Sequence, residues 1–330
     1  MNRREFLKKA AAIAGLVTGE ALGAPPRTGG AKAATVALAR DATLGTLEGA
    51  AFDRLLANLV HRALCDALNV TEPTQAWRRL FRPDDVVAVK VNCLAPEIAP
   101  RQGIIVAVTE GLAAAGVPQE NIIVYDKEDR DLRKAGYELR SGKGGVQCYG
   151  TIGETEGPGY EERFTLVGDT SFRLSKIVTR RATAIINVPV AKQHEYAGVT
   201  GALKNHFGSI HNPEDFHKFA CDPAVADVNK ATPIRTKQRL VIMDATQVLY
   251  EGGPSYQPRY VIPYWAVMVS TDPVAIDAEL VQLIEMCRQK EGLKSLWELD
   301  YTPKHVLTAG QQGLGVADVN SIDLRVYNRT

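Results

Sequence analysis

Most residues that could carry chemistry lie in one stretch of the sequence, which runs from Lys192 to Cys221. Four of the six histidines fall in this stretch, together with lysine, threonine, asparagine and cysteine side chains. Imidazole and thiolate groups ligate zinc, iron or copper, whereas lysine ammonium groups bind carboxylate or phosphate. The stretch therefore predicts either a metal site or an anion site. Its members are Lys192, His194, Thr200, Lys204, Asn205, His206, His211, His217 and Cys221.

A metal site would have to combine thiolates and imidazoles from distant parts of the chain. Its ligands would be Cys93 and Cys221 with two of His194, His206, His211 and His217. The spacing is not diagnostic, because His211 and His217 flank a predicted turn, where a histidine more often hydrogen-bonds the backbone. No Cys-x-x-Cys-x-x-Cys run occurs, which excludes a ferredoxin-type cluster as a local motif. We expect Cys93 and Cys221 to be free thiols near the histidines, although a disulfide between them is the alternative.

Three lysines offer an anion site instead. Lys90, Lys192 and Lys204 come from strand ends or adjacent loops, as do Asn92 and Asn205, and they can converge on a carboxylate or phosphate. Lysines held close together lower one another's pKa, which would leave one neutral as a general base or Schiff-base nucleophile. The alternative is that they are solvated surface lysines. Lys90 differs, because it lies in an apolar run and must be either at an exposed edge or buried with a partner.

Three aspartates are the candidate acids. Asp272 precedes a proline and is placed to cap a helix. Asp277 projects from the first turns of that otherwise apolar helix, where an unpaired carboxylate would be unfavourable, so we expect a lysine partner. Asp244 follows an apolar strand, and either a catalytic role or a structural role in the next turn fits this position.

The apolar periodicity predicts the elements that position these residues. Apolar residues recur at three and four positions from Phe52 to Leu64, which is the period of an amphipathic helix. A βαβ unit and further apolar strands predict an α/β fold, with a mostly parallel sheet and helices on both faces. The predicted strands cover residues 86–91, 122–125, 184–188 and 240–244, and further helices cover 104–115 and 273–288. One cleft at the C-terminal ends of the strands should then hold Lys90, Lys192, His194, Thr200, Lys204 and Asn205.

The composition is that of an ordinary globular protein, with 45% hydrophobic and 23% charged residues. No linker interrupts the pattern, so we expect one domain over residues 34–330. The formal net charge of +1 gives no overall attraction to nucleic acid, and we expect no nucleic-acid partner. The glycine-rich stretch 141–159 predicts a surface loop or irregular hairpin, because it has neither a P-loop ending nor the setting of a dinucleotide fingerprint.

Residues 1–33 have the features of a twin-arginine export signal. Arg3 and Arg4 precede Phe-Leu-Lys, and a weakly apolar run from Ala10 to Val17 follows. This run is too short to cross a bilayer, so we expect no stable membrane span. Small residues predict a cleavage site that leaves a mature chain beginning between about Ala24 and Ala34. The segment predicts export of a folded protein by the twin-arginine translocase, to the periplasm or otherwise outside the cytoplasm.

Short segments that follow the predicted strands resemble the bacterial domain-of-unknown-function family 362. The resemblance covers about residues 86–318, and some members of that family carry an appended four-iron ferredoxin module. It therefore implies an association with iron–sulfur proteins, although this chain has no such module. The segments are Lys90-Val91-Asn92-Cys93, Asn187-Val188-Pro189, Lys192-Gln193-His194, Gly198 to Asn205, Met243-Asp244, Gly252-Gly253-Pro254, Ser270 to Asp277 and Gly313-Leu314-Gly315.

Three functions fit these features. The first is an exported redox-type enzyme or redox accessory protein, with a metal or iron–sulfur centre and a redox partner, as the export signal and the resemblance imply. The second is a cofactor-free enzyme or binding protein that holds an anionic small molecule on the lysines. The third is a non-catalytic assembly factor for another exported complex.

Overall fold

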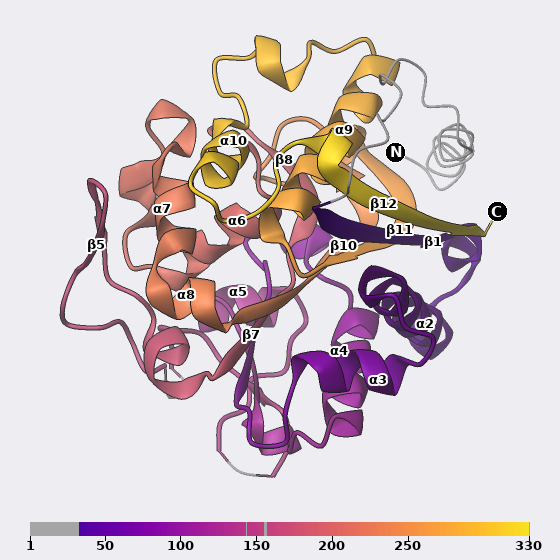
Figure 1. Cartoon of the computed structure of the whole chain (residues 1–330), viewed down its shortest axis with the longest axis vertical. Helices are drawn as coiled ribbons and strands as arrows, with labels where there is room; N and C mark the ends of the chain where they lie inside the picture. Colours follow the sequence, from indigo (N-terminus) through magenta and orange to yellow (C-terminus); the bar gives the residue numbers. More distant parts are fainter. Residues whose placement is uncertain (1–32, 143, 155–156, 330) are drawn as a thin grey trace.

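The computed structural model describes residues 33–142, 144–154 and 157–329. The predicted export signal, with Arg3 and Arg4, lies outside the described residues. Within these ranges no helix is both long enough and apolar enough to cross a membrane. Figure 1 shows a twisted sheet through the middle of the molecule with helices on both sides.

The central sheet is mostly parallel. Its strand order is β12-β1-β11-β10-β7-β2-β3-β4, and β8 pairs with both β10 and β9. β11 is antiparallel to β1 and β10, and β9 is antiparallel to β8, whereas the other strand pairs in the described part of this sheet are parallel. β5 and β6 form a separate antiparallel ribbon. The strands are β1 (Ala34–Asp41), β2 (Val87–Lys90), β3 (Ile122–Tyr125), β4 (Gln147–Cys148), β5 (Thr165–Val167), β6 (Thr170–Phe172), β7 (Ala184–Asn187), β8 (Val190–His194), β9 (Gly198–Val199), β10 (Gln238–Leu249), β11 (Val261–Ser270) and β12 (Ile322–Arg329).

The α-helices cover the two faces of the sheet in two groups. One group, α2 to α4, lies on one face, and α6 to α10 cover the other (Figure 1). The helices are α2 (Gly49–Leu68), α3 (Pro73–Leu80), α4 (Gln102–Ala114), α5 (Asp129–Lys134), α6 (Gly201–Asn205), α7 (Ala224–Lys230), α8 (Thr232–Lys237), α9 (Pro273–Lys290) and α10 (Lys304–Gln311).

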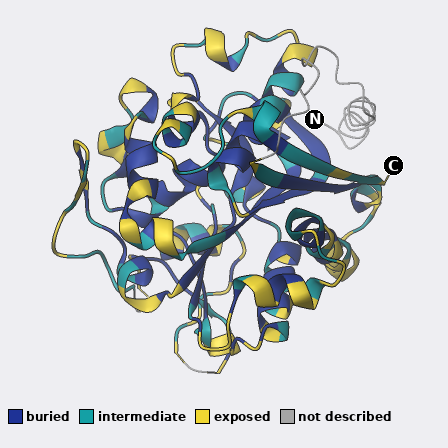
Figure 2. Cartoon of the chain, viewed as in Figure 1, coloured by how far each residue is buried: buried dark blue, intermediate teal, exposed yellow. Residues whose placement is uncertain are grey.

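Side chains of the central strands alternate between two cores, because successive residues of a strand point to opposite faces. Val87 and Val89 of β2 pack with α2, α3 and α4, whereas Ala88 packs in the core beneath α6 to α10. By the same alternation Lys90 points to the side of Ala88. The strands at the centre of the sheet are buried throughout, and exposed residues lie on the outer surfaces of the helices (Figure 2).

The predicted fold class is confirmed, and the predicted elements agree closely with the structure. The predicted strands 122–125 and 184–188 correspond to β3 and β7, and the strand 86–91 contains β2. The helix predicted after Asp272 is α9, and Asp272 caps it by accepting the N–H groups of Val274 at 2.8 Å and Ala275 at 2.9 Å. In the glycine-rich stretch, Arg140 and Cys148 bond each other as in an irregular hairpin.

The predicted end of a strand at Asp244 is wrong. β10 continues to Leu249, because its long antiparallel partner β11 pairs with it on both sides of an irregularity between Ala245 and Gln247. Periodicity alone could not show that the strand continues past the polar residue Asp244. Asp244 therefore lies inside the sheet and not at its C-terminal edge.

Gly111 of α4 provides a test of the packing between α4 and α3. A Cβ at this position would collide with the indole of Trp77, which is fully buried. We expect Gly111→Ala to destabilise the protein by about 1–3 kcal/mol in urea unfolding, because overpacking exceeds the gain in helix propensity. Ala113→Ser, at an exposed position of the same helix, is the control and should change stability by less than about 0.5 kcal/mol. A Gly111→Ala variant as stable as the unmodified chain would contradict this packing.

Candidate functional site

Lys90 and Asp126 form a buried ion pair where two neighbouring parallel strands end. Lys90 is the last residue of β2 and Asp126 directly follows β3, so parallel pairing brings both to one edge. Lys90 Nζ lies 2.7 Å from Asp126 Oδ1 and also donates to Val91 O at 2.6 Å and Asn205 Oδ1 at 3.2 Å. An ammonium group has three N–H donors. Lys90 therefore keeps no donor for a ligand.

Asparagine side chains connect this pair to Lys192. Asn205 Oδ1 accepts from Asn92 Nδ2 at 3.0 Å, and Asn92 Oδ1 accepts from Lys192 Nζ at 2.9 Å. Asn205 Nδ2 in turn donates to Asn187 Oδ1 at 2.8 Å, which fixes the orientation of its amide. The structure thus places Lys90, Asn92, Lys192 and Asn205 in one hydrogen-bonded network.

Lys204 lies in a different environment, among aromatic rings. Its Nζ is 3.3 Å from Nε2 of His217 and 4.5 Å from the ring centroid of Phe207. His217 stacks on His194 with ring centroids 5.7 Å apart, and the Tyr196 ring lies 5.4 Å from that of His217. A neutral imidazole can accept a hydrogen bond from Lys204, but it cannot neutralise the charge.

Lys192 and Lys204 are buried cations that differ from Lys90 in having no paired carboxylate within the described ranges. Their exposed fractions are only 1% and 6%. Burial lowers the pKa of Lys204 to about 8. Burial, and next the charge of Lys204, lower the pKa of Lys192 to about 8. Within the described ranges each ammonium group has a single hydrogen-bond partner, so each retains N–H donors for a ligand.

The short helix α6 carries Lys204, and Asp277 of α9 fixes its first turn. Asp277 Oδ1 accepts the N–H of Ala202 at 2.6 Å and Oδ2 accepts that of Leu203 at 2.9 Å. Gly201 begins the helix at φ +56°, and a Cβ there would collide with the Asp277 carboxylate. The partners of Asp277 are therefore backbone amides and not the lysine that we expected. Burial raises the pKa of Asp277 to about 7.

Asp244 also has a structural environment. Its Oδ2 accepts the N–H of Arg101 at 2.8 Å, and its Oδ1 accepts both the N–H of Thr246 at 2.8 Å and its hydroxyl at 2.7 Å. These contacts correspond to the structural alternative considered for this residue. They hold the segment before α4 against β10.

The histidines predicted as metal ligands separate into different environments. His206 directs one ring nitrogen to Ser209 Oγ at 3.2 Å and the other to Gln238 Oε1 at 2.7 Å. His211 Nδ1 accepts the backbone N–H of Arg173 at 3.0 Å, as expected for a histidine beside a turn. Only His194 and His217 share a site. Among the residues that the structure describes, no group of three or more His, Cys, Asp or Glu is arranged to hold a metal ion.

All five cysteines are buried free thiols, including Cys93 and Cys221. The backbone N–H of Cys93 donates to Asp126 Oδ2 at 2.7 Å, whereas Cys221 Sγ lies 3.5 Å from the carbonyl oxygen of Tyr196. Burial raises the pKa of both thiols, well above the usual range for Cys93. The thiol form is therefore favoured at each position, and the two cysteines lie beside different parts of the site.

Two residues of the site were missed by sequence reasoning. Asp126 could have been found, because it directly follows a predicted strand, which is the position that made Lys90 a candidate. His305 gave no such signal, since it lies far along the chain, on α10. Its ring is fully buried, and Lys204 adds to burial in lowering its pKa to about 3.

The family model described as Domain of unknown function (DUF362) matches residues 87–282, and the chain belongs to this family. The match begins at β2 and ends within α9, so it contains Lys90, Lys192, Lys204 and Asp277 but not His305. None of the curated proteins matches the chain. A crystal structure of a Thermotoga maritima protein, from the Northeast Structural Genomics Consortium, is similar at 12% identity and a TM-score of 0.43, covering 75% of this chain. The chain spans 61% of the length of that protein, and the likeness assigns no activity.

Because Lys90 has a carboxylate partner and Lys192 has none among the described residues, we expect replacement of these two lysines to change the stability of the protein differently. Lys90→Met should cost about 3–5 kcal/mol of stability, because Asp126 would keep a buried charge without its cation. Lys192→Met should leave stability at pH 7 unchanged or higher. The pKa of Lys192 is about 8 in the folded chain against 10.5 for the free group, so its protonated form disfavours folding below pH 8.

Urea unfolding of both variants at pH 7 measures this difference. By the same linkage, the stability of the unmodified chain should rise between about pH 8 and pH 10.5 through Lys192, and this contribution should be smaller in Lys192→Met. Equal destabilisation by the two substitutions would contradict the assignment.

Proposed function

We propose that this protein binds an anionic small molecule through Lys192 and Lys204. The observation that carries the proposal is the burial of two lysines, each without a paired carboxylate within the described ranges and each with hydrogen-bond donors left for a ligand. Burying a charge without a counter-charge is unfavourable, and a bound carboxylate or phosphate would supply that charge. Lys90 is not assigned to anion binding, because its charge is already paired with the Asp126 carboxylate.

The same lysines give the site chemical capability. A lysine whose pKa is about 8 is partly neutral near physiological pH, and a neutral amine can act as a general base or attack a carbonyl group. Lys204 is the better candidate, because its Nζ lies 3.3 Å from Nε2 of His217, a neutral group that orients the amine without adding a counter-charge. Lys192 would then hold the anionic group, with Asn92 fixing its position.

A redox centre remains the competing prediction. The described His and Cys residues do not form a ligand set for a metal ion, so this prediction gains no support from their arrangement. Elemental analysis of protein purified with its N-terminal segment intact would distinguish the two, because a redox metal or iron–sulfur protein must contain near-stoichiometric transition metal.

Anion binding through these lysines should depend on pH. Both must be protonated to attract an anion, and their pKa values are about 8, so binding should weaken as pH rises through that value. We expect inorganic phosphate and succinate to bind at least about tenfold more weakly at pH 9.5 than at pH 7 in titration calorimetry. Lys192→Met and Lys204→Met should each abolish binding at pH 7. Lys176→Met, which replaces a partly exposed lysine outside the network, is the control and should bind normally.

We also propose that the chain is exported through the twin-arginine translocase. The support is the sequence Arg3-Arg4-Glu5-Phe6-Leu7-Lys8 with the short apolar run behind it. Replacing Arg3 and Arg4 by lysine should retain the protein in the cytoplasm on cell fractionation. Arg27→Lys, in the same segment but outside the pair, should leave export unchanged. Normal export of the Arg3, Arg4 variant would reject the proposal.

A further inference from the structure

Three residues, at the start of α6, before α10 and in α10, have side chains with buried polar atoms that make no hydrogen bond. The hydroxyl oxygens of Thr200 and Thr302 and both ring nitrogens of His305 are buried without a hydrogen-bond partner. The residues themselves are 4%, 8% and 0% exposed. Buried polar groups in native proteins are nearly always paired, so such groups call for a bound partner. None of the three is part of the lysine and asparagine network.

The backbone brings these groups together. The rings of Tyr196 and Tyr301 are in contact at 5.5 Å, and a Cβ added at Gly198 would lie 2.6 Å from the backbone nitrogen of Pro303. Thr302 lies between the two contacting residues Tyr301 and Pro303, and Thr200 follows Gly198 by two residues. His305 is close enough to His194, on β8, to lower the pKa of His194 in addition to its burial, so His305 belongs to the same region.

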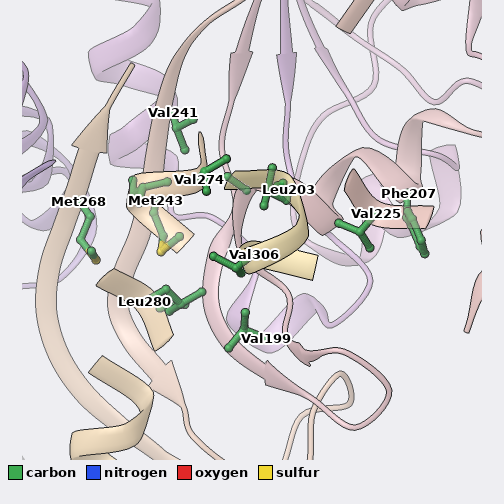
Figure 3. Packing of buried hydrophobic residues seen from close by; sticks show 14 of the residues in the cluster. Val199, Leu203, Phe207, Val225, Val241, Met243, Met268, Val274, Leu280 and Val306 are labelled. Carbon is green, nitrogen blue, oxygen red and sulfur yellow. The ribbon is translucent and has the colours of Figure 1, made fainter. Parts of the chain in front are cut away.

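Packing and electrostatics agree with this placement. Val306, next to His305, packs in the same core cluster as Val199 and Leu203, on either side of Thr200 (Figure 3). The charge of Lys204 acts on His305 and lowers its pKa further after burial. His305 thus lies close to the ammonium group that we assign to anion binding.

The chemistry of this cluster differs from that of the lysines. The pKa of His305 is lowered to about 3, so its ring is neutral at physiological pH and offers one donor and one acceptor. A threonine hydroxyl also donates and accepts. A lysine ammonium only donates, which suits an anion, whereas groups that do both suit a hydroxyl.

We propose that the site has two halves, with Lys192 and Lys204 binding the anionic group of a ligand and His305, Thr200 and Thr302 binding a hydroxyl on the same molecule. The ligand class is then a small hydroxylated carboxylate or phosphate. This inference rests on the proposed function for the anionic half and adds the hydroxyl half. His305 is a binding and positioning residue contributed from beyond the region that the family model matches.

Two matched pairs of probes test the hydroxyl half. Malate and succinate differ by one hydroxyl, and glycerol 3-phosphate and n-propyl phosphate differ only in their hydroxyls. In titration calorimetry at pH 7, we expect the hydroxylated member of at least one pair to bind about tenfold more tightly, which is the contribution of one or two good hydrogen bonds.

Two variants test whether His305 and Thr200 cause the preference for hydroxylated probes. His305→Leu and Thr200→Val should each bring the ratio of affinities close to one, while succinate and n-propyl phosphate bind within about twofold of the unmodified chain. Thr200→Val is nearly isosteric and removes no helix cap, because the Thr200 side chain makes no capping hydrogen bond to α6. Unchanged melting temperature would show that either variant is folded.

The outcomes separate this inference from the proposed function. If succinate and n-propyl phosphate bind but the hydroxyls add nothing in either pair, the hydroxyl half is rejected and the anionic half stands. If the hydroxyl preference survives in both variants, the assignment to His305 and Thr200 is rejected. If none of the four probes binds, the proposed function is rejected together with this inference.

Discussion

The attachment of α6 to α9 is the constraint on which the candidate site depends. The Asp277 carboxylate accepts two backbone N–H groups from the first turn of α6, and the left-handed Gly201 lets the chain approach that carboxylate. Because α6 has little more than one turn, propensity alone would not hold it in place. Lys204 and Asn205 both project from this helix. The Asp277 carboxylate, for which we expected a lysine partner, therefore fixes the helix that carries Lys204 and Asn205.

The buried lysines differ in their partners: Lys90 is paired with a carboxylate, whereas Lys192 and Lys204 are hydrogen-bonded to neutral groups. Lys90 has its carboxylate, Asp126, and every N–H donor of its ammonium group is used. Asn205 then extends this rigid pair to Asn92, which holds Lys192. Lys192 itself has an amide oxygen where Lys90 has a carboxylate. A cation that is oriented by neutral groups and not neutralised by them is the physical basis of the proposed binding of an anion.

The parts of this site that depend on local pattern could be predicted from the sequence, and the parts that depend on tertiary contact could not. The apolar runs of β2, β3 and β7 determine where the strands end, and the predicted strand ends agree with the structure closely enough to place Lys90 at the end of β2. The histidines were misleading because closeness in sequence was taken as closeness in space. In the turns after α6, His206 points to Gln238 and His211 to the backbone of Arg173. His305 reaches this region because α10 packs against α7 and α9, which no short-range signal encodes.

The neutral histidines and the charged lysines depend on each other. His194 and His217 stack face to face, and burial together with the charge of Lys204 holds the pKa of both rings below the usual range. Two imidazolium rings would repel each other in this arrangement, so burial first, and the charge of Lys204 next, favour the neutral pair. With Lys204 protonated, His217 Nε2 must be the acceptor of its hydrogen bond, which places the ring proton on Nδ1. The positive charge of this region therefore stays on the ammonium groups, and the aromatic rings beside Lys204 are neutral.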